Sequence, residues 1–284
     1  MATRLLVFAN CQANPVASTL AVMSPELNII RCAPVHTIPK DNLESVFDLI
    51  SQADVIVHQP IGSNFGPISS DSIKKHYPQK KYISFPSVYC GGIFPHLCYL
   101  RLPQGGTLSG PLSDYHDMRI LKNFLDGMPV KKCVDKLTSD CSDYKELVAS
   151  AKQESYAREA GVDIPLVELI EAALSERPCF YTFNHPDNLL LGLIAARVLE
   201  LLGMKIAPNV KLRQKPFLGE ISAAIPRGVS KALGASWCRD FYAIGGEIIA
   251  WHNLVESFYS EYANVTDFRA IVDFNRKRSK LHLI

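Results

Sequence analysis

The sequence predicts an α/β protein built on a doubly wound parallel sheet. Short apolar runs alternate with helix-like segments over much of the 284 residues, and 48% of the residues are hydrophobic. Such alternation is typical of a parallel sheet covered by helices on both faces. The apolar content is enough for a large buried core, so we expect a single α/β domain over residues 1–284.

Five apolar runs are predicted to be strands, at residues 5–9, 27–32, 54–58, 81–85 and 179–183. Helices are predicted between them, around residues 13–23, 43–53 and 187–202. Because parallel crossovers are right-handed, few topologies remain, and a flavodoxin-like order places the first strand beside the third.

Two regions depart from this alternation. Residues 115–176 are more polar, with helix-like segments at 118–125, 143–159 and 166–174, and we expect them to form a helical insertion or cap. From residue 210 onward we expect mixed helices and loops, which make a helical C-terminal part.

Composition restricts the classes of partner. The 30 Lys and Arg residues nearly balance the 28 Asp and Glu residues, for a net charge of +2. The charge therefore favours neither a nucleic acid nor a membrane surface as partner. No apolar run has the length of a transmembrane helix, and the first one is too short for a signal peptide. We expect a cytoplasmic protein.

The cysteines are predicted to be reduced thiols, because no CxxC pair is present and most lie in apolar surroundings. The same spacing argues against a zinc site, so we expect no metal. The eight cysteines are Cys11, Cys32, Cys90, Cys98, Cys133, Cys141, Cys179 and Cys238.

Cys11 is the first candidate catalytic residue. It lies in Asn10-Cys11-Gln12, where the first predicted strand ends and a helix begins. Backbone N–H groups at a helix start favour negative charge, so we expect a lowered thiol pKa. Asn10 and Gln12 are expected to orient the site or to donate hydrogen bonds to an oxyanion. The alternative is a cysteine that is only a small buried hydrophobe.

His185 is the second candidate, in Asn184-His185-Pro186 after the last predicted strand. Proline is favoured at a helix start, so we expect His185 at a helix N-cap, on the sheet edge where ligands bind. A Cys11–His185 pair suits acyl transfer, with the imidazole taking and returning a proton. The alternative is a histidine that only caps a helix.

Further polar residues are binding candidates, and each has a structural alternative as a packed, capping or solvated residue. His58 and Gln59 end the third strand, where His58 is also a rival base. The loop after the fourth strand is suited to an acceptor pocket. Basic residues are suited to a phosphate-rich cofactor, as is the run at 276–280. The remaining candidates are Ser87, Tyr89, His96, His116, Lys211, Arg213 and Lys215.

Several motifs of other enzyme classes are missing. The sequence has no GxGxxG after its first strand and no GxxxxGK[ST], which disfavours dinucleotide and ATP chemistry. It also has no GxSxG nucleophile elbow.

Four motifs in order carry a resemblance to a known family: Asn10-Cys11-Gln12, Gln59-Pro60, the Phe85-Pro86 to Phe94-Pro95-His96 loop, and Asn184-His185-Pro186. Together they resemble the WcbI-type capsular polysaccharide biosynthesis enzymes, over residues 1 to about 200. The resemblance implies an SGNH-hydrolase-like α/β fold and an acetyltransferase that binds coenzyme A. It places Cys11 at the nucleophile position and His185 at the base position. The SGNH serine is replaced by Cys11, and the Asp-x-x-His element is absent because Asp187 follows His185.

From these observations we expect an O-acetyltransferase that uses acetyl-CoA and a hydroxyl of a small-molecule or lipid-linked sugar. An acetyl-enzyme on Cys11 and a direct transfer with His185 as base are both open. Two other functions remain: an esterase or deacetylase that uses the same residues, and a non-enzymatic sugar- or nucleotide-binding module.

Overall fold

The computed structural model describes residues 2–39, 43–140 and 142–277. A single domain was expected, but the chain divides into two compact units. The first unit contains residues 1–89, 152–174 and 184–218, and the second contains 90–151, 175–183 and 219–284. The expected insertion at 115–176 is therefore shared between the two units.

The first unit is built on a four-stranded parallel sheet in the order β2-β1-β3-β4. Leu5 of β1 pairs with Ile29 of β2 and Val55 of β3, and His58 of β3 pairs with Ser84 of β4. The predicted neighbourhood of the first and third strands is confirmed. The strands are β1 (Arg4–Phe8), β2 (Asn28–Ile30), β3 (Val55–His58) and β4 (Lys81–Ser84).

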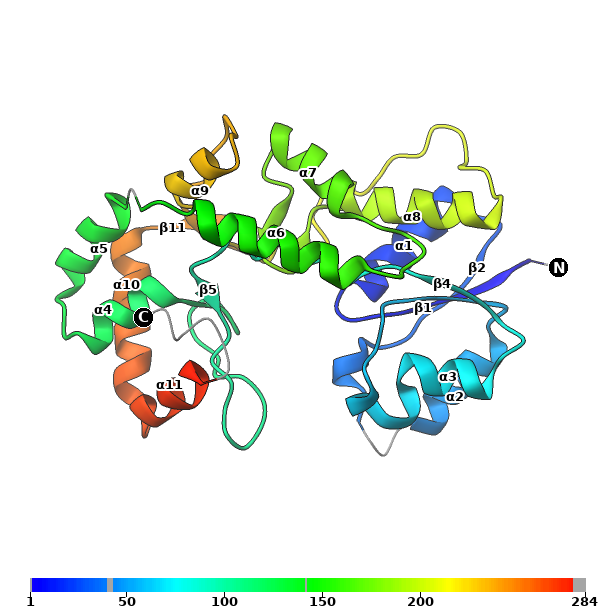
Figure 1. Cartoon of the computed structure of the whole chain (residues 1–284), viewed down its shortest axis with the longest axis horizontal. Helices are drawn as coiled ribbons and strands as arrows, with labels where there is room; N and C mark the ends of the chain where they lie inside the picture. Colours follow the sequence, from blue (N-terminus) through cyan, green and yellow to red (C-terminus); the bar gives the residue numbers. More distant parts are fainter. Residues whose placement is uncertain (1, 40–42, 141, 278–284) are drawn as a thin grey trace. The chain divides into compact units, whose positions relative to one another are not determined.

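Helices cover both faces of this sheet, as expected for a doubly wound fold. Helices α2 and α3 lie on one face, and α1 and α8 pack together on the other (Figure 1). The helical elements are α1 (Ala13–Met23), α2 (Leu43–Gln52), α3 (Ser70–His76), α8 (Asn188–Leu202) and the short 3-10 segments η1 (Val35–Thr37) and η2 (Ser63–Ile68).

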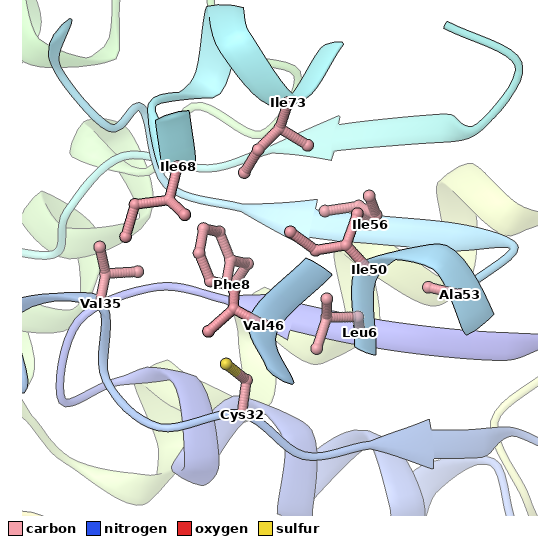
Figure 2. Close-up of a cluster of buried hydrophobic side chains, with 10 residues drawn as sticks. All are labelled: Leu6, Phe8, Cys32, Val35, Val46, Ile50, Ala53, Ile56, Ile68 and Ile73. Carbon is pink, nitrogen blue, oxygen red and sulfur yellow. The ribbon is translucent and has the colours of Figure 1, made fainter. Parts of the chain in front are cut away.

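The core explains why β1 is apolar from Leu5 to Phe8. Leu6 and Phe8 of β1 point toward α2 and α3, where they meet Ile50, Ile56 and other buried side chains (Figure 2). The intervening Leu5 and Val7 are also buried. When both faces of a strand are covered, side chains pointing to either face must be apolar. The sequence of such a strand is therefore an unbroken hydrophobic run.

The second unit holds short antiparallel sheets and a helical layer. β10 lies between β9 and β11, β5 pairs with β6, and α10 packs against α4 and α5. The strands are β5 (Leu97–Cys98), β6 (His116–Asp117), β7 (Phe180–Thr182), β9 (Ile221–Ser222), β10 (Tyr242–Ile244) and β11 (Glu247–Ile249). The helices are α4 (Met118–Leu125), α5 (Val130–Thr138), α9 (Arg227–Ala232), α10 (Trp251–Asn264) and α11 (Phe268–Arg276).

Helices α6 (Lys145–Glu159) and α7 (Val167–Glu176) fall close to the predicted 143–159 and 166–174. Helix α5 was not predicted, and neither was the antiparallel sheet of β9, β10 and β11 in the part expected to hold helices and loops. Strand β8 (His185–Pro186) precedes α8.

One strand prediction needs correction. Phe180–Thr182 is a strand, β7, but the four-stranded sheet of the described residues does not include it. The Arg239 guanidinium donates to the Phe180 and Tyr181 carbonyls at 2.8 and 3.2 Å, and the Ala223 N–H donates to Tyr181 at 2.8 Å. These bonds occupy carbonyls that a neighbouring strand of the parallel sheet requires.

Across the described ranges, no helix combines the length and the apolar character needed to cross a membrane. The described cysteines are free thiols, and Cys141 lies outside the described residues.

Candidate active site

Two buried glutamines organise the carboxyl end of the parallel sheet. The Gln12 amide nitrogen donates to the Val88 and Asn184 carbonyls at 2.8 and 2.9 Å. The Gln12 amide oxygen accepts from Gln59 Nε2 at 2.7 Å and from the Val88 N–H at 3.1 Å. Gln12 therefore ties the turn after β1 to the ends of β3 and β4 and to the segment before α8. This corrects its expected role as an oxyanion donor, since both amide hydrogens are already used.

Asn10 fixes the turn from the other side. Its side-chain oxygen accepts the Gln12 N–H at 2.9 Å and lies 3.9 Å from the Cys11 Sγ. Its side-chain nitrogen donates to Ser87 Oγ at 3.1 Å, and its backbone N–H donates to Gln59 Oε1 at 3.1 Å. The structure thus brings four of the predicted residues together around Cys11.

The Cys11 thiol is partly buried, and burial raises its pKa to about 11, although its own backbone N–H partly opposes the shift. The expectation of a lowered pKa is wrong. The first amides of α1 are used elsewhere: Gln12 N–H goes to the Asn10 side chain, and Ala13 N–H goes to the Asn10 carbonyl at 2.9 Å. Pro15 has no N–H to offer. Desolvation of the thiolate therefore outweighs the helix start.

His185 lies in β8, and Asp187, not His185, is the N-cap of α8, with its side chain accepting the Leu190 N–H at 2.9 Å. The expected capping role of His185 is thus wrong, because a carboxylate two residues later satisfies the helix start. Burial lowers the imidazole pKa to about 4, partly offset by a hydrogen bond to the Leu218 backbone. The ring is therefore neutral at pH 7. The Gln12–Asn184 bond brings the residue before His185 to the Cys11 turn.

A basic loop follows α8 and is fixed by one side chain. Asn188 Nδ2 donates to the carbonyls of Arg213 and Lys215 at 2.6 and 3.0 Å, and Asn188 Oδ1 accepts the Phe217 N–H at 3.0 Å. The side chains of Lys211, Arg213 and Lys215 are exposed. Asn188 was missed from the sequence, although its place in Asn-His-Pro-Asp-Asn gave a signal.

Arg158 places a further cation against the ring of Tyr89. The Arg158 guanidinium lies over its ring, 4.3 Å from the centroid, within the range of a cation–π contact. Tyr89 follows Val88, which Gln12 holds through both backbone groups. Arg158 lies on α6, far from the turn in sequence, and no motif pointed to it.

The other candidate histidines are buried in separate places. His58 lies beside Tyr82, with its Nδ1 2.9 Å from the Gln59 carbonyl, and burial lowers its pKa. In the second unit, His96 Nε2 is 3.1 Å from the Tyr242 hydroxyl and His116 Nδ1 is 3.0 Å from the Tyr262 hydroxyl. All three rings are packed in the protein interior, which agrees with the alternative that these histidines have a structural role. Of the basic run, Arg276 pairs with Asp273, and residues 278–280 lie outside the described ranges.

Taken together, the first unit offers a half-buried thiol on a rigid turn, a neutral imidazole in the segment that Gln12 holds beside that turn, and exposed cations on an anchored loop. A thiol and a neutral imidazole are the groups used in acyl transfer. Exposed cations are suited to a phosphorylated ligand.

The comparisons with known proteins agree with this architecture. Residues 4–206 match the family described as polysaccharide biosynthesis enzyme WcbI. The fold is similar to a solved structure of WcbI, with a TM-score of 0.80 and 16% identity over 99% of this chain and 97% of that one. That structure is described as a novel polysaccharide biosynthesis enzyme, in its native form without a disulfide bond between coenzyme A and one of its cysteines. No curated protein matches the sequence. Because the family match covers most of the length, this chain belongs to the WcbI family of polysaccharide biosynthesis enzymes.

Proposed function

We propose that the protein is an O-acetyltransferase that moves the acetyl group of acetyl-CoA to a sugar hydroxyl in polysaccharide biosynthesis. The observation that carries the proposal is the half-buried Cys11 thiol on a turn fixed by Asn10, Gln12 and Gln59. The WcbI structure supports it, because its description relates coenzyme A to a cysteine of that protein. A cysteine thiol that lies close to the coenzyme A sulfur is next to the atom that carries the acyl group in acetyl-CoA.

The surroundings of the turn suit a phosphorylated thioester. The loop that Asn188 anchors presents Lys211, Arg213 and Lys215 to solvent, and Arg158 lies over Tyr89. Guanidinium and ammonium groups pair with phosphate oxygens, and guanidinium groups do so in a bidentate manner. We assign these cations to the phosphates of coenzyme A.

Because the pKa of Cys11 is raised, the reaction requires a base that removes the proton of the thiol. At pH 7 the thiol is protonated, so its proton must leave as the sulfur attacks. We assign His185 as the acceptor, because its ring is neutral at this pH. The sulfur attacks the thioester carbonyl carbon, the bond to the coenzyme A sulfur breaks, and the departing thiolate takes the proton from His185. The sugar hydroxyl then gives its proton to His185 and attacks the acetyl-Cys11 carbon, and the Cys11 sulfur leaves and regains that proton.

The tetrahedral intermediates need donors for their oxyanion. The Cys11 N–H and the second hydrogen of Asn10 Nδ2 are the groups of the turn that we assign to this role. The backbone N–H groups of Asn10, Gln12 and Ala13 already have acceptors. A donor of this kind contributes about 3 kcal/mol to transition-state stabilisation.

The test is an acetyl-transfer assay that follows both release of coenzyme A and the acetylated sugar, with and without a sugar acceptor. The proposal predicts that release beyond one equivalent per chain depends on the acceptor and equals the acetyl-sugar formed. Equal release in water alone would show a hydrolase instead. Cys11→Ala and His185→Asn should each abolish transfer, whereas His76→Asn, an exposed histidine on α3, should leave it unchanged.

A further inference from the structure

The second unit contains a cavity of about 300 Å³, a size at the lower end of small-molecule sites. Its lining includes the apolar residues Leu137, Ala224 and Ile225 and the charged residues Arg119 and Asp140. The rest of the lining is Thr138, Pro226, Arg227, Asp240 and Trp251.

Arg119 is held rigidly at this cavity by two aspartates, the buried Asp117 and the partly buried Asp140. It donates to both carboxylate oxygens of Asp117, at 3.1 and 2.7 Å, and to Asp140 at 3.2 Å. Asp117 has no exposed surface, and its second oxygen also accepts the Tyr242 hydroxyl at 2.8 Å. A buried ion pair is weak support for stability, because desolvation opposes the attraction. Its geometric effect is to aim the remaining Arg119 hydrogens in a fixed direction.

Asp140 is also saturated by the protein. Its oxygens accept from Arg119, from the Tyr144 hydroxyl at 2.7 Å, and from both the N–H and the hydroxyl of Ser142. Asp140 thus positions Arg119 and has no spare capacity for a cation. The Arg119 guanidinium is therefore a preorganised donor in the lining, which suits an oxygen-rich ligand.

Trp251 contributes ring surface. Its indole N–H donates to the Asp240 carbonyl at 3.0 Å, and its ring meets Tyr242 edge to face at 5.3 Å. With the N–H used, the indole offers an apolar surface to the cavity. An aromatic wall beside fixed polar groups matches a ligand that has both C–H faces and hydroxyls.

The charges of the lining cancel. Arg119 and Arg227 face Asp140 and Asp240, and Arg227 lies 3.7 Å from Asp240. A phosphate or carboxylate ligand would find each guanidinium already beside an acid. A neutral ligand rich in hydroxyls would meet both donors and acceptors without a net charge to neutralise.

We propose that this cavity is a binding site for a neutral saccharide, with Arg119 and Asp240 hydrogen-bonding its hydroxyls and Trp251 covering its C–H face. The choice of a saccharide rests on the proposed function, but binding here is measured without acetyl-CoA. Loss of sugar binding and loss of acetyl transfer at Cys11 are therefore separate results.

The chain's two tryptophans, Trp237 and Trp251, allow a direct test. In Trp237→Phe, the emission of Trp251 is followed during titration with glucose, galactose and mannose, and with glucuronate as the acidic counterpart. We expect a saturable change with at least one neutral hexose and about tenfold weaker binding of glucuronate, equal to ~1.4 kcal/mol. The matched Trp251→Phe protein should show no saturable change.

Asp240→Ala should weaken the hexose about tenfold. Asp273→Ala, an exposed acid on α11, should leave it unchanged. No saturable response of Trp251 to any hexose, an equal response in Trp251→Phe, or tighter binding of glucuronate would each overturn the proposal.

Discussion

Gln59 Nε2 donates to Gln12 Oε1 across 2.7 Å, with 4% and 0% of the two residues exposed. Each amide then reaches a different strand end: Gln59 Oε1 accepts from Asn10, and Gln12 bonds Val88 and Asn184. The turn that carries Cys11 is thus held by a hydrogen-bond network that is connected through the side chains of Gln12 and Gln59. Such a network stabilises one geometry of the turn, because losing one member leaves several buried groups unpaired.

Gln12→Ala should lower the free energy of unfolding by about 3 kcal/mol, because it removes the partners of three backbone groups and of Gln59. Urea unfolding measures the change. Gln52→Ala makes the same chemical change on the exposed side of α2 and should cost less than about 0.5 kcal/mol. Equal effects of the two substitutions would contradict the structural role of Gln12.

Much of the first unit could be predicted from the sequence. Apolar runs identify all four strands of its sheet, and the signal is clearest for β1 and β3, which are buried almost throughout. The same signal gave a wrong prediction at Phe180–Thr182, where a similar apolar run forms a strand outside that sheet and Arg239 bonds its carbonyls. Periodicity reports burial and does not report the partner of a strand.

The candidate site was partly predictable. Asn10, Gln12 and Gln59 were identified by their place at strand ends, but which of their atoms are free depends on contacts between segments far apart in sequence. The pKa of Cys11 was predicted in the wrong direction for the same reason. The thiol's burial comes from packing that local sequence does not describe.

Asn188→Ala should release the basic loop. The Asn188 side chain makes three hydrogen bonds to the backbone of residues 213, 215 and 217, and without them the loop opens more often. We expect tryptic cleavage after Lys211 and Arg213 to become about tenfold faster, equal to ~1.4 kcal/mol of lost protection. Mass spectrometry locates the cuts, and Asn253→Ala, an exposed asparagine on α10, should cut at the original rate.

Stability should fall as the pH drops from about 6.5 to 4. Burial lowers the pKa of His116 to about 4, with a hydrogen bond to Leu108 opposing part of the shift, and lowers that of His185 to about 4. Between pH 6.5 and 4 these histidines therefore bind protons in the unfolded chain but not in the folded chain. The stability that the folded chain has above pH 6.5 is lost as the pH falls toward 4. His116 alone should account for about 3 kcal/mol.

Urea unfolding between pH 4 and 7 measures this slope. His116→Phe should make the slope shallower by the share of His116, because the replaced ring no longer titrates, while His185 still contributes. A slope that stays the same in this variant would show that His116 is not buried as a neutral ring. His76→Asn, at an exposed histidine on α3, is the matched control.

Alkylation should report the state of the Cys11 thiol. Since burial raises its pKa to about 11, its thiolate is scarce at pH 7 and increases up to that value. We expect iodoacetamide to label the exposed Cys238 first at pH 7, and the rate at Cys11 to rise steadily to pH 10. A rate at Cys11 that is already at its plateau by pH 7 would contradict the raised pKa.

The most direct measurement of the central claim is a mass spectrum of the protein after brief mixing with acetyl-CoA, without a sugar acceptor. The account predicts one acetyl group per chain, located on the peptide that contains Cys11, and its loss when a sugar acceptor is added. Cys11→Ala should bind coenzyme A by calorimetry but carry no acetyl group. A wild-type protein that transfers acetyl to sugar without ever carrying it on Cys11 would contradict the covalent route, and one that fails to bind coenzyme A would contradict the function itself.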